Sequence, residues 1–239
     1  VMACPFLLFP ALLLLLLTGC GGQAVPPDSS QAGQAVCGTV RYDSGNTVSP
    51  CRISDYYIDS SAGIRVFVDY PDYYQADGDE IAELIHQAAY NGRTMEDLAS
   101  SYPNTTITVN YEVTRNDAQY FSAAFLFCAI TQGAAHPSSS EYAVTIDRAS
   151  NRPVRLSDIL EFDSSQDLAR LIAESFTPLG NRSDLPPLEK LASRYTDPDF
   201  YDGDRHFYLT EDSLCLQVSC WGDYVLEAPL SSLSLLSEP

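Results

Sequence analysis

The sequence predicts an α+β fold in which antiparallel sheets have helices packed on one face and two sequential subdomains form one compact unit. Two observations lead to this class. Stretches that alternate apolar and polar residues, as half-buried strands do, are interspersed with shorter stretches whose apolar residues recur at helical spacing. Beyond the N-terminal segments described below, about 190 residues remain, which is enough for one large core or two small ones.

The first predicted subdomain spans residues 51–150. Residues 63–70 alternate apolar and polar side chains and stop at Pro71, which predicts a strand. Residues 80–90 place Ile81, Leu84 and Ile85 on one helical face and end at Asn91-Gly92, which predicts a helix. The remaining elements follow in order: a short helix over 95–100 and strands over 105–114, 120–131 and 142–147.

The second predicted subdomain spans residues 151–236. Residues 156–160 close a strand and begin a helical region, and residues 167–176 place Leu168, Leu171 and Ile172 at helical spacing. Residues 188–195 also have a helical pattern. Three closing strands are predicted over 206–210, 214–219 and 224–229, with turns at Glu211-Asp212 and Gly222-Asp223.

The N-terminus has the pattern of a bacterial lipoprotein. Six leucines, residues 12–17, lead into Thr18-Gly19-Cys20, which has the lipobox form L-[AST]-[GA]-C. The apolar run is about half the ~20 residues that a membrane-spanning helix needs, so residues 1–19 are predicted to be a signal peptide and Cys20 the lipidated first residue. No Lys or Arg precedes the run, and an ordinary cleaved signal is the alternative.

Residues 20–50 are expected to form the lipidated cysteine and a flexible tether, because residues 21–34 are rich in Gly, Gln, Ser and Pro and have no apolar periodicity. These segments together predict an exported protein that is held to the bacterial cell membrane by its lipid and faces outside the cytoplasm. The sequence does not decide between Gram-positive and Gram-negative envelopes.

All charged residues lie beyond residue 19, where 13 basic and 32 acidic side chains give a net charge of −19. Such a surface repels nucleic acid and anionic lipid headgroups, and it attracts cationic partners when the salt concentration is low. The charge therefore argues against nucleic-acid binding. Acidity of this kind also serves solubility alone, so it names no partner by itself.

Five cysteines remain once Cys4 and Cys20 are set aside, which is an odd number. Thiols tend to pair outside the cytoplasm, and a Cys37–Cys51 disulfide is predicted to attach the entry segment to the domain. Cys215 and Cys220 are five residues apart, so in one strand they face opposite sides. Either of them could pair with Cys128, and this choice stays open.

The sequence predicts no metal site and no cofactor. It has no C-x-x-C motif, and its three histidines, His86, His136 and His206, are scattered. The acidic segment 197–204 fails the spacing of an EF-hand loop, because Tyr201 stands where the fifth position needs an acid. A solvated turn is the main interpretation of that segment, and an irregular calcium site is the alternative.

Several short motifs occur in the order seen in a pair of bacterial domains of unknown function: Val68-Asp69-Tyr70-Pro71, Tyr111-Glu112-Val113-Thr114, Tyr120-Phe121-Ser122, Gln132-Gly133-Ala134-Ala135-His136-Pro137, Asp147 and Leu156-Ser157-Asp158-Ile159-Leu160. Over residues 53–233 the chain resembles the extracytoplasmic region of the RsiV family of lysozyme-sensing anti-sigma factors and of related surface lipoproteins. The resemblance implies the extracytoplasmic fold and makes lysozyme a candidate partner.

This chain departs from the family pattern at three places. Ala134 replaces the second glycine of the family's Gly-Gly-Ala-His turn, Ala149-Ser150-Asn151-Arg152 replaces a Thr-Gly-Lys turn, and the aromatic loop near the C-terminus is shortened to residues 220–224. The sequence given has no cytoplasmic sigma-binding domain and no transmembrane helix. Regulation of a sigma factor is therefore not carried over.

The sequence predicts no catalytic residues. His136 precedes three serines, but adjacent residues of an extended segment do not present their side chains to one another as a triad does. We expect Gly133, His136 and Pro137 to form a structural turn, with the His136 ring bonded to backbone. The sequence also lacks G-x-S-x-G, H-E-x-x-H and a glycine-rich phosphate loop.

Tyrosines crowd the first half of the chain among carboxylates. Tyr56, Tyr57, Tyr73, Tyr74 and Asp72 are the candidate partner-binding residues, because aromatic anchors bordered by acids suit the lysines and arginines of a cationic protein, or the faces of sugars. The alternative is that each tyrosine simply packs the sheet.

These observations predict a membrane-anchored surface lipoprotein that acts as a non-catalytic extracytoplasmic recognition domain and binds lysozyme, another cationic protein or a glycan. The alternative is a cell-envelope enzyme or enzyme accessory that acts on peptidoglycan or wall glycans. A broad, shallow aromatic and acidic face would favour recognition, and a deep pocket lined by polar groups would favour an enzyme.

Overall fold

The computed structural model describes residues 35–42, 51–73, 79–179, 186–196, 206–219 and 223–235. Within them lie two sheets and two hydrophobic cores. The larger sheet has seven strands in chain order: β1 Val36–Tyr42, β2 Cys51–Asp59, β3 Ile64–Asp72, β4 Thr105–Asn116, β5 Tyr120–Thr131, β6 Ser138–Asp147 and β7 Arg152–Pro153. All neighbours are antiparallel except β3 and β4.

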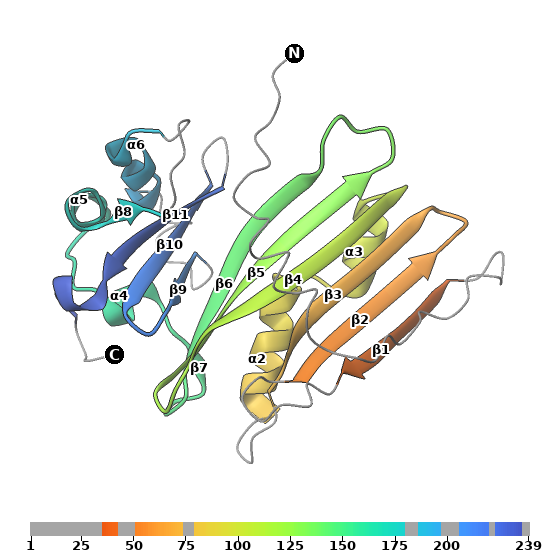
Figure 1. The fold of residues 1–239 in the computed structure, drawn as a ribbon, viewed down its shortest axis with the longest axis horizontal. Coiled ribbons are helices and arrows are strands. Elements are labelled where there is room, and N and C mark those ends of the chain that lie inside the picture. Colours follow the sequence, from red (N-terminus) through yellow and green to blue (C-terminus); the bar gives the residue numbers. More distant parts are fainter. Residues whose placement is uncertain are drawn as a thin grey trace.

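The parallel pair arises because two helices form the crossover between β3 and β4, as parallel neighbours require. These are α2, Asp79–Ala89, and α3, Met95–Ser101. Figure 1 shows both helices on one side of the sheet, behind strands β3 to β6. Thr94 starts α3 with a capping box, in which its hydroxyl accepts from the Asp97 N–H while the Asp97 carboxylate accepts from the Thr94 N–H.

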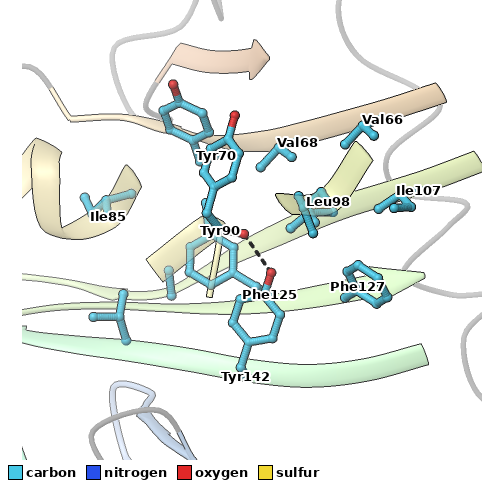
Figure 2. Packing of buried hydrophobic residues seen from close by; sticks show 14 of the residues in the cluster. Val66, Val68, Tyr70, Ile85, Tyr90, Leu98, Ile107, Phe125, Phe127 and Tyr142 are labelled. Atoms are coloured by element: carbon cyan, nitrogen blue, oxygen red, sulfur yellow. Dashed lines mark hydrogen bonds between the residues drawn. The ribbon is translucent and has the colours of Figure 1, made fainter. Parts of the chain in front are cut away.

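The first core lies between this sheet and the two helices (Figure 2). β3 buries Ile64, Val66, Val68 and Tyr70, while the residues between them are half-buried or exposed, which is the alternation of a strand with one covered face. Helix α2 contributes Ile81 and Ile85, and α3 contributes Leu98.

The second sheet has the order β8-β11-β10-β9 and is antiparallel throughout. Its strands are β8 Thr177–Pro178, β9 Phe207–Leu209, β10 Ser213–Ser219 and β11 Asp223–Pro229. The second core packs this sheet against α5, Ser165–Ser175, and α6, Leu188–Ala192. Three short elements complete this part: α4 Leu156–Ile159, η1 Ser193–Thr196 and η2 Leu230–Ser232.

The predicted α+β class is confirmed: the sheets are almost entirely antiparallel, and helices pack against them. Strands β1 and β2 were missed. Residues 36–42 lie within the segment 20–50 that the sequence predicts to be a flexible tether, but they pair with β2 over seven residues. In the part of the chain that the structure describes, no helix is long and apolar enough to cross a membrane.

The register of β1 and β2 contradicts the predicted Cys37–Cys51 disulfide. Cys37 lies opposite Tyr57, six positions along β2 from Cys51. At about 3.3 Å per residue the two positions are about 20 Å apart, whereas a disulfide joins Cα atoms less than about 7 Å apart. Cys37, Cys128 and Cys215 are free thiols, so Cys128 does not pair with Cys215 either, while Cys220 lies outside the described residues.

Candidate recognition surface

One face of the seven-stranded sheet points away from α2 and α3, and we call it the open face (Figure 1). The strand register identifies its residues, because side chains that are paired across neighbouring strands share a face. One row crosses five strands through Tyr56, Phe67, Thr108, Cys128 and Ser139. The open face therefore extends over most of the sheet.

A second row crosses the open face through Ile58, Arg65, Thr106 and Ile130. Ile130 is 56% exposed, which is high for a large aliphatic side chain in a strand. Between β5 and β6, Leu126 lies opposite Glu141. The centre of the open face is thus a mixture of half-buried apolar side chains and threonines.

At one end of the open face, the second sheet lies against β5 and β6. The backbone N–H of Leu209 in β9 donates to Ser122 Oγ at 3.0 Å, and Ser122 Oγ lies 2.8 Å from Thr145 Oγ1. Nearby, Nη1 of Arg115 donates a hydrogen bond to the backbone carbonyl of Thr210 at 3.5 Å. These bonds hold β9 over the end of the open face near Ser122. The opposite end, near Ile130, is not covered by β9.

Glu112 of β4 and Glu141 of β6 lie near Tyr208 of β9, and Glu227 of β11 lies opposite Cys215 of β10, which is itself paired with Tyr208. We call these three glutamates the acidic rim. Burial raises the pKa of Tyr208, and its neighbours Cys215, Glu141 and Glu112 raise it further. Burial likewise raises the pKa of the Cys215 thiol to about 12, the Tyr208 hydroxyl opposes that rise and Glu227 adds to it. Tyr208 and Cys215 are therefore neutral side chains beside a concentration of negative charge.

On the β2–β3 side of the open face, the carboxylate of Asp69 is paired with an arginine. Arg52 lies 3.5 Å from Asp69, and its guanidinium stacks 4.2 Å from the Tyr42 ring centroid. Burial raises the pKa of Asp69, while hydrogen bonding from Ser54 and the charge of Arg52 oppose the rise. On the open face, Asp69 is thus paired with an arginine, whereas the glutamates of the acidic rim lie near the neutral side chains of Tyr208 and Cys215.

Behind the sheet, one buried carboxylate joins four elements. Asp55 of β2 accepts hydrogen bonds from Thr39 Oγ1 of β1 at 2.6 Å, from Tyr70 Oη of β3 at 3.0 Å and from Tyr90 Oη after α2 at 2.8 Å. His86 Nε2 of α2 lies 3.5 Å from Asp55 Oδ2. We call this set the Asp55 cluster; it holds the edge strands of the open face to the helix layer.

The pKa values within the Asp55 cluster reflect this geometry. Burial alone would raise the pKa of Asp55, but hydrogen bonds from His86, Thr39, Tyr90 and Tyr70 outweigh it and lower the pKa to about 2. The hydrogen bond to Asp55 raises the pKa of His86 against the opposing effect of burial. The Asp55 cluster therefore stabilises the ionised form of the carboxylate and the protonated form of the imidazole.

Stability should follow these shifts in two pH windows. The pKa of Asp55 is lower in the folded protein than its ordinary value of 3.8, so ionisation of Asp55 stabilises the fold by about 2 kcal/mol. This stabilisation is complete above pH 3.8 and is lost as the pH falls toward about 2. The contribution of His86 has the opposite sign: it is complete below about pH 6.5 and is lost as the pH rises through the raised folded pKa. Denaturant unfolding of the wild type, Asp55→Asn and His86→Asn between pH 2 and 9 checks both windows. If the free energy of unfolding of the wild type changes with pH in the same way as that of both variants, the two pH windows are wrong.

The candidate partner-binding residues do not form one surface. Tyr56 lies on the open face, where its ring covers Gly38 so closely that an added Cβ would stand 2.6 Å from the Tyr56 hydroxyl. Tyr57 packs against the first core, and Tyr73 is buried with its ring edge-on to Phe121. Asp72 pairs with Arg41 at 2.9 Å. Tyr74 lies outside the described residues, so of this set only Tyr56 reaches the open face.

The remaining predicted positions lie apart from the open face's acidic end. Gly133 adopts a φ of 85° in the turn between β5 and β6, a conformation that favours glycine. His136 in the same turn has Nδ1 3.0 Å from the Pro137 carbonyl oxygen. Cys20 and residues 197–204 lie outside the described residues. In those parts that are described, no group of three or more His, Cys, Asp or Glu side chains is placed to hold a metal ion.

Comparison with known proteins places the chain beside structures of unassigned function. No protein-family model matches the sequence, and no curated protein matches it. Among the solved structures that are similar, two are described as DUF3298 family proteins. The one from Bacteroides fragilis NCTC 9343 has 13% sequence identity and a TM-score of 0.47, and the match covers 85% of this chain and 94% of the other. The one from Pseudomonas aeruginosa PAO1 has 13% identity and a TM-score of 0.42, with 83% and 90% covered. The structural neighbours of this chain are thus members of a domain family whose function is unknown.

Proposed function

We propose that this protein is a non-catalytic extracytoplasmic recognition domain, anchored to the bacterial membrane through lipidated Cys20, that binds a cationic protein on the open face. The observation that carries the proposal is the combination of a sheet face that α2 and α3 leave uncovered, with apolar side chains among its threonines, and the acidic rim at one end of that face. Lysozyme, a small basic protein, is the first partner to test, since the resemblance to the RsiV family implies it.

The apolar part of the open face supplies area for association. Phe67 of β3 lies on the open face together with Leu126 and Ile130 of β5, with β4 between the two strands, and Tyr56 of β2 extends this area toward β1. Aromatic and aliphatic side chains at the centre of an interface contribute most of its affinity when a partner excludes water from them. A sheet face of this kind suits a protein surface better than it suits a small substrate, which needs a concave site.

The charges favour a basic partner. The net charge of −19 attracts cationic proteins over a distance that shrinks with salt. On contact, lysines or arginines would reach Glu112 and Glu141, beside the ring of Tyr208, which offers a cation–π surface. Charge complementarity of this type raises the association rate and selects against acidic proteins.

The test is a titration of hen lysozyme into the chain from residue 35 onward, which contains every described element. We expect binding with a dissociation constant in the micromolar range or tighter, at least about tenfold weaker in 300 mM than in 50 mM salt. Lysozyme activity should fall in parallel if the bound protein covers the cleft. Absence of binding in 50 mM salt would remove lysozyme as the partner, and binding that is independent of salt would contradict the role given to the charges.

A further inference from the structure

A small pocket opens on the side of the sheet opposite the open face, at the end of α2. Its volume is about 90 Å³. The wall is formed by Tyr90 after α2, Leu98 of α3, Phe127 of β5 and Tyr142 of β6, all of which Figure 2 shows grouped in the first core. The mouth is formed by polar residues from two other segments, Arg93 before α3 and Ser138 and Ser140 at the start of β6.

The cation at the mouth is available to a ligand. Arg93 is exposed, its Nη1 lies 3.5 Å from Tyr102 Oη, and its Cζ lies 5.9 Å from the Phe127 ring centroid. Among the described residues, no carboxylate oxygen lies within 4.0 Å of its guanidinium. Asp97 is near enough for Arg93 to lower its pKa, but that carboxylate accepts two hydrogen bonds from Thr94. Arg93 thus places a positive charge at the mouth of the pocket in a chain of net charge −19.

Two hydroxyl groups face the same space. Ser138 and Ser140 alternate with Tyr142 on the helix side of β6, and both are exposed. Over the described parts of the chain neither hydroxyl has a hydrogen-bond partner. The Tyr142 hydroxyl is already used, since it donates to the Ala89 carbonyl at 2.7 Å, so its ring serves as wall. The pocket thus has free donors at its mouth and rings behind them.

We propose that this pocket binds the terminal carboxylate of a peptide, with Arg93 and the Ser138 and Ser140 hydroxyls as donors. A guanidinium matches the two oxygens of a carboxylate with two parallel hydrogen bonds. The volume is far below the roughly 300–1,000 Å³ of sites that enclose a whole small molecule, so the pocket accepts one end of a longer ligand. The rings of Phe127 and Tyr102 would contact a small aliphatic side chain next to the carboxylate, and the exposed mouth would let the rest of the peptide leave.

The test uses the chain from residue 35 onward and two probes, N-acetyl-Ala-Ala as the free acid and as the C-terminal amide, titrated by NMR. The free acid should bind with a millimolar dissociation constant and shift the signals of residues 90–102 and 138–142. The amide should bind at least about tenfold more weakly, because it offers no negative charge to Arg93. Equal binding of the acid and the amide would overturn the proposal. In a separate titration, inorganic phosphate that binds as tightly as the free acid would also overturn it.

Variants locate the site. Arg93→Gln should weaken binding of the free acid about tenfold, and Ser140→Ala about threefold. Arg93→Lys keeps the positive charge but cannot form two parallel hydrogen bonds to a carboxylate, so it should also weaken binding of the free acid several-fold. The matched control is Arg65→Gln, because Arg65 is an exposed arginine on the open face. If Arg65→Gln weakens binding as much as Arg93→Gln, general electrostatics explains the binding and the proposed site is wrong. Lysozyme binding should be unchanged in Arg93→Gln, which separates this site from the open face.

Discussion

Replacement of Asp55 by alanine is expected to lower the free energy of unfolding by about 3–5 kcal/mol, the cost typical of breaking a buried charged interaction from one side. The Asp55 side chain accepts from Thr39, Tyr70 and Tyr90 and pairs with His86, so its loss leaves two buried tyrosine hydroxyls without an acceptor. Each unsatisfied buried group costs about 1–3 kcal/mol. Denaturant unfolding at pH 7 measures the difference.

Two further substitutions divide this effect. Tyr90→Phe removes a single donor and is expected to cost about 1 kcal/mol. Asp163→Ala, at an exposed aspartate between α4 and α5, should change the stability by less than about 0.5 kcal/mol. If Asp55→Ala costs no more than Asp163→Ala, the Asp55 cluster does not hold β1 and β2 to the helix layer.

The second large effect concerns partner binding. Glu112→Lys places a positive charge on the exposed acidic rim and is expected to weaken lysozyme binding at least about tenfold in 50 mM salt, mainly by slowing association. Glu174→Lys makes the same change in charge on an exposed position of α5, in the second part of the molecule. It should weaken binding about twofold or less, because only the long-range field changes.

The apolar part of the open face has its own pair of variants. Ile130→Asp should weaken binding at least about tenfold if the open face is buried in the complex, since it puts a charge where apolar contact is expected. Leu179 is similarly exposed, at 52% against 56% for Ile130, but it follows β8 in the second sheet. Leu179→Asp is therefore the matched control and should bind as the wild type does. Equal losses in both variants would mean that the substitution acts through stability or solubility.

Elements with a clean period could be predicted from the sequence. β3, β4, β5, α2 and α5 each bury one face against a core, so their apolar residues recur every second residue or at helical spacing. β1 and β2 could not be predicted in this way. Gly38 interrupts β1, and β2 places Asp55 toward the core, where three hydroxyl donors and a histidine compensate its charge. The apolar pattern of β2 alone cannot predict a buried Asp55, because the side chains that bond to this carboxylate come from β1, β3 and the end of α2.

The residues of the open face could not be located from the sequence. The prediction grouped tyrosines that are close in sequence, but Tyr56 and Tyr57 point to opposite faces of β2, and Tyr73 is buried against Phe121. The open face combines residues from strands far apart in the chain, such as Phe67, Cys128 and Leu126, and only the register aligns them. Alternation in β4 and β5 indicated which residues face away from the core. The predicted fold class placed helices on one face of the sheet, but without the register the sequence did not show which residues share the other face.

The most direct test of the central claim is methyl NMR of the chain from residue 35 onward, labelled at isoleucine and leucine methyl groups, during titration with lysozyme in 50 mM salt. We predict that the signals of Leu126 and Ile130 on the open face shift or broaden, while those of Ile85 and Leu98 behind the sheet and of Leu179 in the second part stay in place. Perturbation confined to Ile85 and Leu98, or to Leu179, with Leu126 and Ile130 unchanged, would contradict the assignment of the open face as the binding surface.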